Sequence, residues 1–270
     1  MPDFIESGSV GPLVMLMHSS VSGAKMWRRL TDALKDRYRV RAVNLIGYGG
    51  TPPWREERPQ SLDDQARVVE AALPEDADEV YLVGHSFGGA VAMKTAARLG
   101  GRVTKLALLE ANPCYLLQRA GRHEAFAQAT AMRDCIKAGG DSGDWETAAA
   151  TFADYWGGAG AWEATPPERR ETFIAALRPN YHEWDAILNE QTPMEDWGAL
   201  LPKATLYVYD PATRRSILEA VELFRRAHPH WTFREITTGG HMAPLTRPDL
   251  INPIIADFLD GNVVRASPAS

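Results

Sequence analysis

This sequence has few cysteines, no long apolar run and no excess of basic charge, and each shortage excludes a class of protein. Only Cys114 and Cys135 are cysteines among 270 residues, too few for a disulfide framework or a cysteine-rich zinc site. No apolar run approaches the ~20 residues that a membrane-spanning helix needs. The formal net charge is −6, whereas nucleic-acid-binding surfaces are normally basic. We therefore expect no metal site and no binding to nucleic acid or membrane.

The first ten residues, "MPDFIESGSV", lack the basic and apolar regions of a signal peptide. Two unpaired thiols are also typical of a reducing compartment. We therefore expect a cytoplasmic protein, and its oligomeric state stays open.

Short apolar runs alternate with amphipathic segments in the first 111 residues. The apolar runs predict strands, and near-continuous apolar strands are typical of a parallel sheet covered on both faces. These strands are expected over 12–18, 38–45, 79–85 and 103–111. Helices are expected over 27–34, 62–73, with Ser61 as its N-cap, and 90–99, ending at Gly100. Strand and helix alternating in this way predict an α/β sheet with right-handed crossovers.

The pattern changes between residues 112 and 201, where no convincing strand occurs and alanine, charged residues and five tryptophans dominate. Strand and helix patterns return from 204 to 259. We therefore predict a mostly parallel α/β core over 1–111 and 202–262, a helical cap over 112–201 and a disordered tail over 263–270. A cap at this point in the chain is expected to cover the carboxyl edge of the sheet, where such sheets bind ligands.

The stretch "VYLVGHSFGGAVAM" (80–93) places Ser86 between two glycines where a strand gives way to a helix. Gly84-His85-Ser86-Phe87-Gly88 fits the G-x-S-x-G nucleophile elbow, and its strand–turn–helix context separates it from a chance match. Such a turn lifts the serine Oγ clear of the sheet at a helix N-terminus, where developing negative charge is favoured. The alternative is a glycine-rich turn with an incidental serine.

A serine nucleophile needs a general base, and the base needs a carboxylate that orients it. Among seven histidines, His241 in "TTGGHMAPL" follows the last predicted strand and comes last in the order nucleophile, acid, base. Two carboxylates end strands between Ser86 and His241. We favour Asp210, which ends "ATLYVYD", and keep Glu110, which ends "KLALLEA", as the alternative.

Two backbone amides are expected to form an oxyanion hole. The amide of Phe87 follows the nucleophile directly, and the second amide comes from the loop "HSSVSG" after the first predicted strand. Within that loop we assign Ser20, with His18 serving the loop's structure.

These motifs together resemble the α/β-hydrolase superfamily, from about residue 12 to residue 259. "VMLMHSS" is similar to its oxyanion loop, "NLIGYGGT" to its D-x-x-G-x-G-x-S segment, "GHSFGG" to its elbow, "YDPAT" to its acid turn and "GGHM" to its histidine loop. Ser19 and Asn44 stand where glycine and aspartate are usual, and the short N-terminus suggests that the first strands are reduced or missing.

The resemblance implies a serine hydrolase without a cofactor that acts by acyl transfer on a small molecule. We expect it to cleave a carboxylic ester or a lactone. Five further residues are expected to contact the substrate: His18, Ser19, Tyr155, Trp156 and Met242.

Two other functions remain open. A carbon–carbon bond hydrolase, a lyase or a perhydrolase could use the same triad, and Arg133 or Tyr155 facing Ser86 would favour one of these. A non-catalytic ligand-binding protein on the same scaffold is the third candidate.

Overall fold

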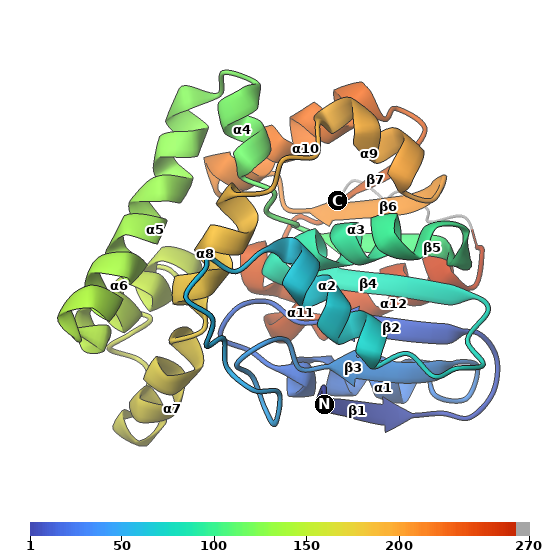
Figure 1. The fold of residues 1–270 in the computed structure, drawn as a ribbon, viewed down its shortest axis with the longest axis horizontal. Coiled ribbons are helices and arrows are strands. Elements are labelled where there is room, and N and C mark those ends of the chain that lie inside the picture. The colour runs from blue at the N-terminus through green and yellow to red at the C-terminus, as the bar shows by residue number, and fades with distance from the viewer. Residues whose placement is uncertain (263–270) are drawn as a thin grey trace.

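A seven-stranded sheet with helices on both faces forms the centre of the computed structural model, which describes residues 1–262 (Figure 1). The predicted tail at 263–270 lies outside these residues. The strand order is β1-β3-β2-β4-β5-β6-β7. β1 runs antiparallel to β3, and the other neighbouring pairs are parallel. The strands are β1 (Phe4–Ser7), β2 (Leu13–Met17), β3 (Arg39–Val43), β4 (Val80–His85), β5 (Val103–Leu109), β6 (Ala204–Tyr209) and β7 (Thr232–Glu235). The prediction of a mostly parallel sheet is confirmed.

Each face of the sheet is covered because its central strands are apolar on both sides. β2 and β4 are buried at every position. One face packs against η1 (Ala24–Trp27), α1 (Arg28–Leu34) and α12 (Pro248–Leu259), and the other against α2 (Leu62–Ala71), α3 (Phe87–Leu99) and α10 (Arg215–Ala227). In Figure 1, α2 and α3 lie in front of the sheet and α1 and α12 behind it.

Local sequence signals explain several element ends. The prediction of Ser61 as N-cap is confirmed: its side chain accepts from the Asp64 amide, and the Asp64 carboxylate accepts from the Ser61 amide in a capping box. α3 ends at Leu99, and Gly100 follows as its C-cap with a φ of 56°, which few other residues adopt. At the N-terminus the sheet keeps one short strand, β1, which hydrogen-bonds along β3 as an antiparallel edge.

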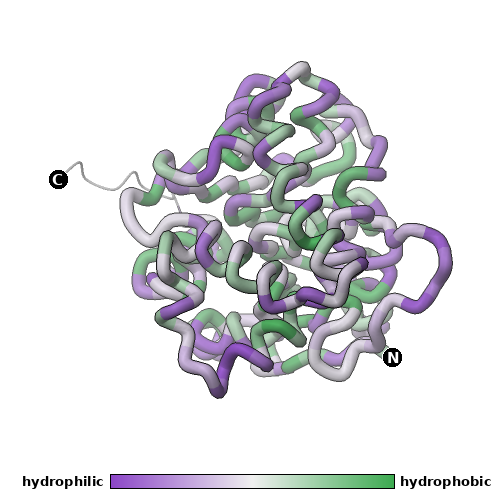
Figure 2. Tube along the Cα trace, turned by 90° about the vertical axis from the view of Figure 1, so that its left-hand side faces the viewer, coloured by the Kyte–Doolittle hydropathy of each residue, from purple (hydrophilic) through white to green (hydrophobic). Residues whose placement is uncertain are grey.

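Six helices lie between β5 and β6 in the chain, where the sequence predicts a helical cap. They are α4 (Tyr115–Arg119), α5 (His123–Ser142), α6 (Trp145–Gly157), α7 (Pro167–Leu177), α8 (Asn180–Leu188) and α9 (Met194–Leu200). We call residues 112–201 the helical segment. Most of it lies beyond the carboxyl ends of the strands, on the left of Figure 1. Figure 2 views the molecule from this side, where hydrophilic and hydrophobic residues alternate along the chain, the pattern of helices that bury one face.

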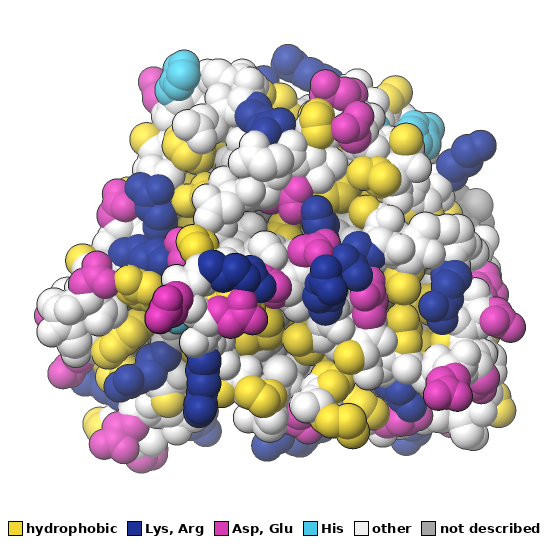
Figure 3. All heavy atoms as spheres, viewed as in Figure 1, with side chains coloured by type: hydrophobic (Ala, Val, Ile, Leu, Met, Phe, Trp, Pro, Cys, Tyr) yellow, Lys and Arg dark blue, Asp and Glu magenta, His cyan; other side chains and the backbone are white. Residues whose placement is uncertain are grey.

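The surface carries charges of both signs. On the face shown in Figure 3, Lys and Arg side chains lie among Asp and Glu side chains, without a large patch of one sign. None of the helices within residues 1–262 has the length and apolar character needed to cross a membrane.

Parallel pairing brings three polar residues to one edge of the sheet. Ser86, Glu110 and Asp210 directly follow β4, β5 and β6, which are neighbours in that order. The Ser86 amide donates to the Leu109 carbonyl at 2.9 Å, and the Glu110 amide donates to the Val208 carbonyl at 2.9 Å. Ser86 is therefore one strand from Glu110 and two strands from Asp210.

Candidate active site

Ser86 occupies a sharp turn between β4 and α3. Its φ and ψ are 54° and −119°, a conformation that costs a non-glycine residue free energy. The neighbouring glycines make the turn possible by their size. A Cβ at Gly84 would lie 2.2 Å from the Gly88 carbonyl oxygen, and one at Gly88 would lie 2.4 Å from the carbonyl oxygens of Met17 and His18. The elbow geometry expected from G-x-S-x-G is therefore present.

His241 connects Ser86 to a carboxylate. It lies in the short helix η3 (Gly240–Met242), which follows β7. Its Nε2 is 3.0 Å from the Ser86 Oγ, and its Nδ1 is 2.7 Å from the Glu110 Oε2. With the proton on Nδ1, the ring donates to the carboxylate and accepts from the serine hydroxyl, as a general base requires. All three side chains are buried, with at most 7% of any residue exposed.

Backbone strain is concentrated around these residues. Among the described residues, three other than glycine have a positive φ: Val21 at 65°, Ser86 at 54° and Glu110 at 43°. Val21 belongs to the loop after β2, and the other two carry the hydrogen-bonded side chains. Strained conformations persist where the surrounding structure enforces them, and they cluster at functional sites.

The preference for Asp210 as the partner of His241 is wrong in this structure. The Asp210 carboxylate instead accepts from two backbone amides, those of Ala212 at 2.8 Å and Gly240 at 3.0 Å. Glu110 holds the position beside the imidazole because it follows the strand next to β4 and its side chain has one more methylene. Asp210 has a supporting place, since its own amide donates to the Glu110 Oε1 at 2.8 Å.

Two further histidines are buried around the site and hold backbone in place. His18 Nδ1 donates to the Ser19 carbonyl at 2.7 Å, and its Nε2 accepts from the Leu45 amide at 3.1 Å. Burial lowers the pKa of His18 to about 4. His85 Nε2 donates to the His241 carbonyl at 2.8 Å, and burial holds its pKa well below the usual value. Both rings are therefore neutral and act on backbone conformation.

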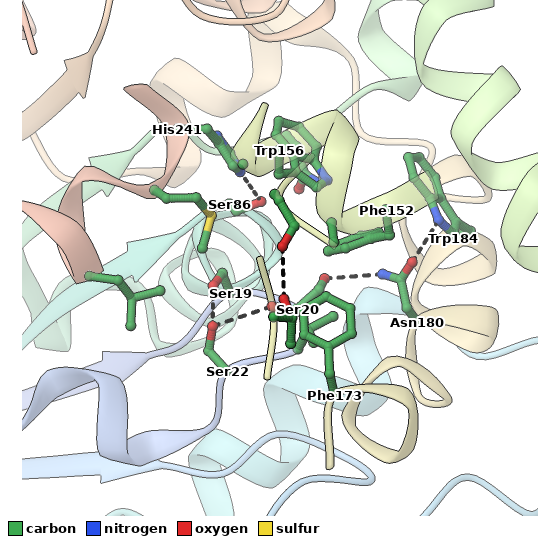
Figure 4. A pocket seen from close by; sticks show the side chains of 18 residues that line it. Ser19, Ser20, Ser22, Ser86, Phe152, Trp156, Phe173, Asn180, Trp184 and His241 are labelled. Atoms are coloured by element: carbon green, nitrogen blue, oxygen red, sulfur yellow. Dashed lines mark hydrogen bonds between the residues drawn. The ribbon is translucent and has the colours of Figure 1, made fainter. Parts of the chain in front are cut away.

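A cavity of about 380 Å³ opens onto Ser86 and His241 (Figure 4). Its lining combines aromatic side chains with hydroxyl and amide groups and contains no Lys, Arg, Asp or Glu among the described residues. The residues that line it are Ser19, Ser20, Val21, Ser22, Ser86, Asn112, Phe152, Ala153, Trp156, Gly157, Ala161, Thr165, Phe173, Asn180, Trp184, His241, Met242 and Leu245. The lining of the cavity is therefore largely apolar, as in many small-molecule sites.

The predicted substrate contacts divide into two groups. Ser19, Trp156 and Met242 line the cavity. Trp156, from α6, stacks on His241 with ring centroids 3.9 Å apart and planes at 27°. His18 and Tyr155 do not belong to the lining. His18 is turned into the core by its two backbone contacts, and the Tyr155 ring faces the Arg214 guanidinium at 4.2 Å.

Sequence reasoning missed several residues of the lining and its support. Phe152, Phe173 and Trp184 supply aromatic walls, and Asn180 and Glu183 join Trp184 on α8. The three residues on α8 could have been grouped from the sequence, because positions 180, 183 and 184 share one face of a helix. Nothing in that spacing indicates that the face points toward the loop after β2. The described residues also bring together no group of three or more His, Cys, Asp or Glu that could hold a metal ion.

Known proteins resemble this chain in sequence. A model of the Alpha/beta hydrolase family matches residues 13–254. Pimeloyl-(acyl-carrier protein) methyl ester esterase of Aeromonas hydrophila subsp. hydrophila is 34% identical over 112 residues, which are 42% of each chain. Protein phosphatase methylesterase 1 of Mus musculus is 37% identical over 97 residues, 34% of this chain and 25% of that protein. The chain thus spans less than half the length of these curated relatives.

Solved structures resemble it over nearly its whole length. A hydrolase from Pseudomonas aeruginosa PA01 superposes with a TM-score of 0.72 at 18% identity, covering 95% of this chain and 93% of that chain. A thermophilic esterase from Thermogutta terrifontis gives 0.70 at 20% identity, covering 96% and 93%. At these identities the likeness is one of fold.

Proposed function

The chain belongs to the alpha/beta hydrolase family, and we propose that it is a serine hydrolase that cleaves small carboxylic esters or lactones. The observation that carries this proposal is the hydrogen-bonded series Ser86–His241–Glu110, with distances of 3.0 and 2.7 Å. The series opens onto a cavity large enough for a small substrate.

In the proposed reaction, the Ser86 Oγ attacks the substrate carbonyl while His241 Nε2 takes the hydroxyl proton. Glu110 stabilises the imidazolium that forms and holds its tautomer. The imidazolium then protonates the leaving alcohol. A water molecule, deprotonated by the same nitrogen, attacks the acyl-enzyme and releases the acid.

The tetrahedral intermediates carry a negative oxygen that needs donors. We assign the amides of Phe87 and Ser20 to it. Phe87 is the first residue of α3, so its N–H has no partner within the helix. Ser20 lines the cavity from the loop after β2.

The chemistry of the lining supports an ester with neutral, mainly apolar groups. Phe152, Trp156, Phe173 and Trp184 offer aromatic surface, and no cationic side chain of the described lining would pair with a carboxylate on the substrate. Two of the relatives are named as methyl ester esterases or methylesterases, which supports an ester as the bond that is cleaved. The proposal covers both open esters and lactones.

No observation specifically supports a carbon–carbon bond hydrolase, a lyase or a perhydrolase. Neither Arg133 nor Tyr155 belongs to the cavity lining. The Arg133 guanidinium pairs with Asp134 on the surface of α5, and Tyr155 faces Arg214.

The test is hydrolysis of a panel of p-nitrophenyl esters and lactones by the wild type and by Ser86→Ala. We expect Ser86→Ala to lose at least about 10⁴-fold in kcat, because the nucleophile is gone. Ser142→Ala is the matched control, since Ser142 lies exposed at the end of α5, where its hydroxyl donates to the Ala138 carbonyl and accepts from the Asp144 amide. Equal hydrolysis by Ser86→Ala and Ser142→Ala would overturn the proposal.

A further inference from the structure

A buried carboxylate of the helical segment lies against the loop that follows β2. Glu183, on α8, is 0% exposed. It accepts hydrogen bonds from the Ser20 hydroxyl, from the Asn180 amide at 2.6 Å and from the Tyr48 hydroxyl at 2.8 Å. Figure 4 shows Ser20 and Asn180 facing each other at the cavity. Three donors offset the free energy that burying this carboxylate costs.

Tyr48 extends the contact to the residue after Ser20. Its hydroxyl oxygen accepts from the Val21 amide at 3.1 Å while its proton goes to Glu183. Its ring also packs edge-on against His18, with centroids 4.6 Å apart. Val21 has a φ of 65°, which a β-branched residue adopts only under constraint. Glu183 is therefore connected to both the side chain of Ser20 and the strained residue beside it.

Two of the three donors come from outside the helical segment. Ser20 and Tyr48 lie more than 130 residues before Glu183 in the chain. A carboxylate needed only to pack α8 could be replaced by an apolar residue at little cost in stability. The position of Glu183 instead joins the helical segment to the loop after β2, to which we assign the second oxyanion donor. Burial raises the pKa of the Glu183 carboxyl, and its three donors act in the opposite direction.

We propose that Glu183 is a positioning residue that holds the Ser20 amide in place for the oxyanion, so that the oxyanion hole is complete only while α8 is docked on the loop. The inference rests on the proposed serine-hydrolase function. It adds a role for the helical segment that goes beyond shaping the cavity: the segment takes part in transition-state stabilisation through Glu183 and Tyr48.

The experiment compares Glu183→Gln, Tyr48→Phe and Ser20→Ala with the wild type. A glutamine offers one acceptor oxygen and one NH₂ where the carboxylate accepts three donors, so the loop loses part of its anchor. Misplacing an oxyanion donor by a fraction of an ångström to an ångström costs roughly 10- to 100-fold in kcat. We expect this loss for Glu183→Gln, with KM changed by less than about threefold because the ground state makes little use of the donor.

A second readout follows the oxyanion directly. A trifluoromethyl ketone forms a hemiketal with Ser86 whose oxygen needs the same donors, so its affinity should fall by the same factor as kcat/KM. A loss carried by KM alone, or inhibitor binding that stays at the wild-type level, would overturn the proposal.

If Glu183→Gln does not fold, Tyr48→Phe and Ser20→Ala provide the test, because each removes one hydroxyl. Wild-type values in both would equally overturn it.

Glu190→Gln is the matched control. Glu190 is also a carboxylate of the helical segment with little exposure, its side chain being 7% exposed, but it pairs with Lys94 on α3 at 3.0 Å and accepts from Gln191 and Thr192. We expect it to keep wild-type kcat and inhibitor affinity, and an equal loss in Glu190→Gln would reduce the role of Glu183 to packing.

Labelling by a fluorophosphonate separates the two proposals, since it requires no knowledge of the substrate. Absence of labelling in the wild type contradicts the serine-hydrolase function itself. Labelling that is lost in Ser86→Ala but unchanged in Glu183→Gln contradicts the positioning role alone.

Discussion

The ends of β5 and β6 each present a carboxylate at the same edge of the sheet, yet only one of them meets the imidazole. Glu110, after β5, accepts from His241 Nδ1 and from the Thr213 hydroxyl, both at its Oε2. Asp210, after β6, accepts from the backbone amides of Ala212 and Gly240. One carboxylate therefore faces a titratable ring, and the other holds the loop that carries this ring.

The difference follows from position in the sheet. Neighbouring strands lie about 4.8 Å apart, so each strand of distance from β4 moves a carboxylate away from Ser86. Glu110 is next to β4 and has the longer side chain, whereas Asp210 is one strand further. Asp210 still affects the site indirectly, because its amide donates to the Glu110 Oε1 and its carboxylate fixes the residue before His241. Two carboxylates at equivalent strand ends can thus have different roles: one orients the base, and the other supports the loop that carries the base.

Among variants that distinguish the two carboxylates, Glu110→Gln is expected to have the largest effect. The variant removes the charge that stabilises the imidazolium and the acceptor that holds the Nδ1 tautomer, so we expect kcat to fall by about 10⁴-fold. Steady-state hydrolysis of the best ester from the panel measures it. Circular dichroism of the variant checks that the sheet is intact. A fall of less than tenfold in a folded protein would contradict the role given to Glu110.

Asp210→Asn is expected to cost far less, below about tenfold in kcat, because the amide oxygen still accepts one of the two backbone N–H groups. Its main effect should be on stability, a loss of about 1 kcal/mol in the free energy of unfolding from the weaker of these contacts. Urea unfolding and the same ester assay measure the two effects. A kinetic loss equal to that of Glu110→Gln would return the acid role to Asp210.

The smallest effect is expected for Thr213→Val, which keeps the shape of the side chain and removes its hydrogen bond to the Glu110 Oε2. One such bond is worth about 1 kcal/mol, which corresponds to roughly fivefold in kcat when the whole loss falls on the orientation of Glu110. The assay is again ester hydrolysis, with KM expected to stay constant. An increase in KM without a change in kcat would show that Thr213 acts on substrate binding.

Local signals in the sequence predict the turn at Ser86 and the sheet, but not which carboxylate meets His241. The turn at Ser86 is encoded by Gly84 and Gly88, whose lack of a side chain the geometry requires. The apolar strands predict the parallel sheet in the same local way. Which of Glu110 and Asp210 contacts His241 depends on the strand order and on the φ of 43° at Glu110. Neither can be predicted from the residues that flank the two carboxylates.

Contacts between segments that are distant in the chain cannot be predicted from local sequence signals either. Trp156 is predicted among the substrate contacts, but its stacking on His241 depends on how α6 packs over η3. The contact of Glu183 with Ser20 joins positions 163 residues apart. Helical periodicity places Glu183 on a face of α8, while only the packed fold determines what that face meets.

The most direct test of the division between the two carboxylates is the proton NMR signal of the His241 Nδ1–H. A proton held between imidazole and carboxylate resonates far downfield of the backbone amides. We predict that this signal is present in the wild type, persists in Asp210→Asn and disappears in Glu110→Gln. Its persistence in Glu110→Gln together with its loss in Asp210→Asn would contradict the assignment of Glu110 as the partner of His241.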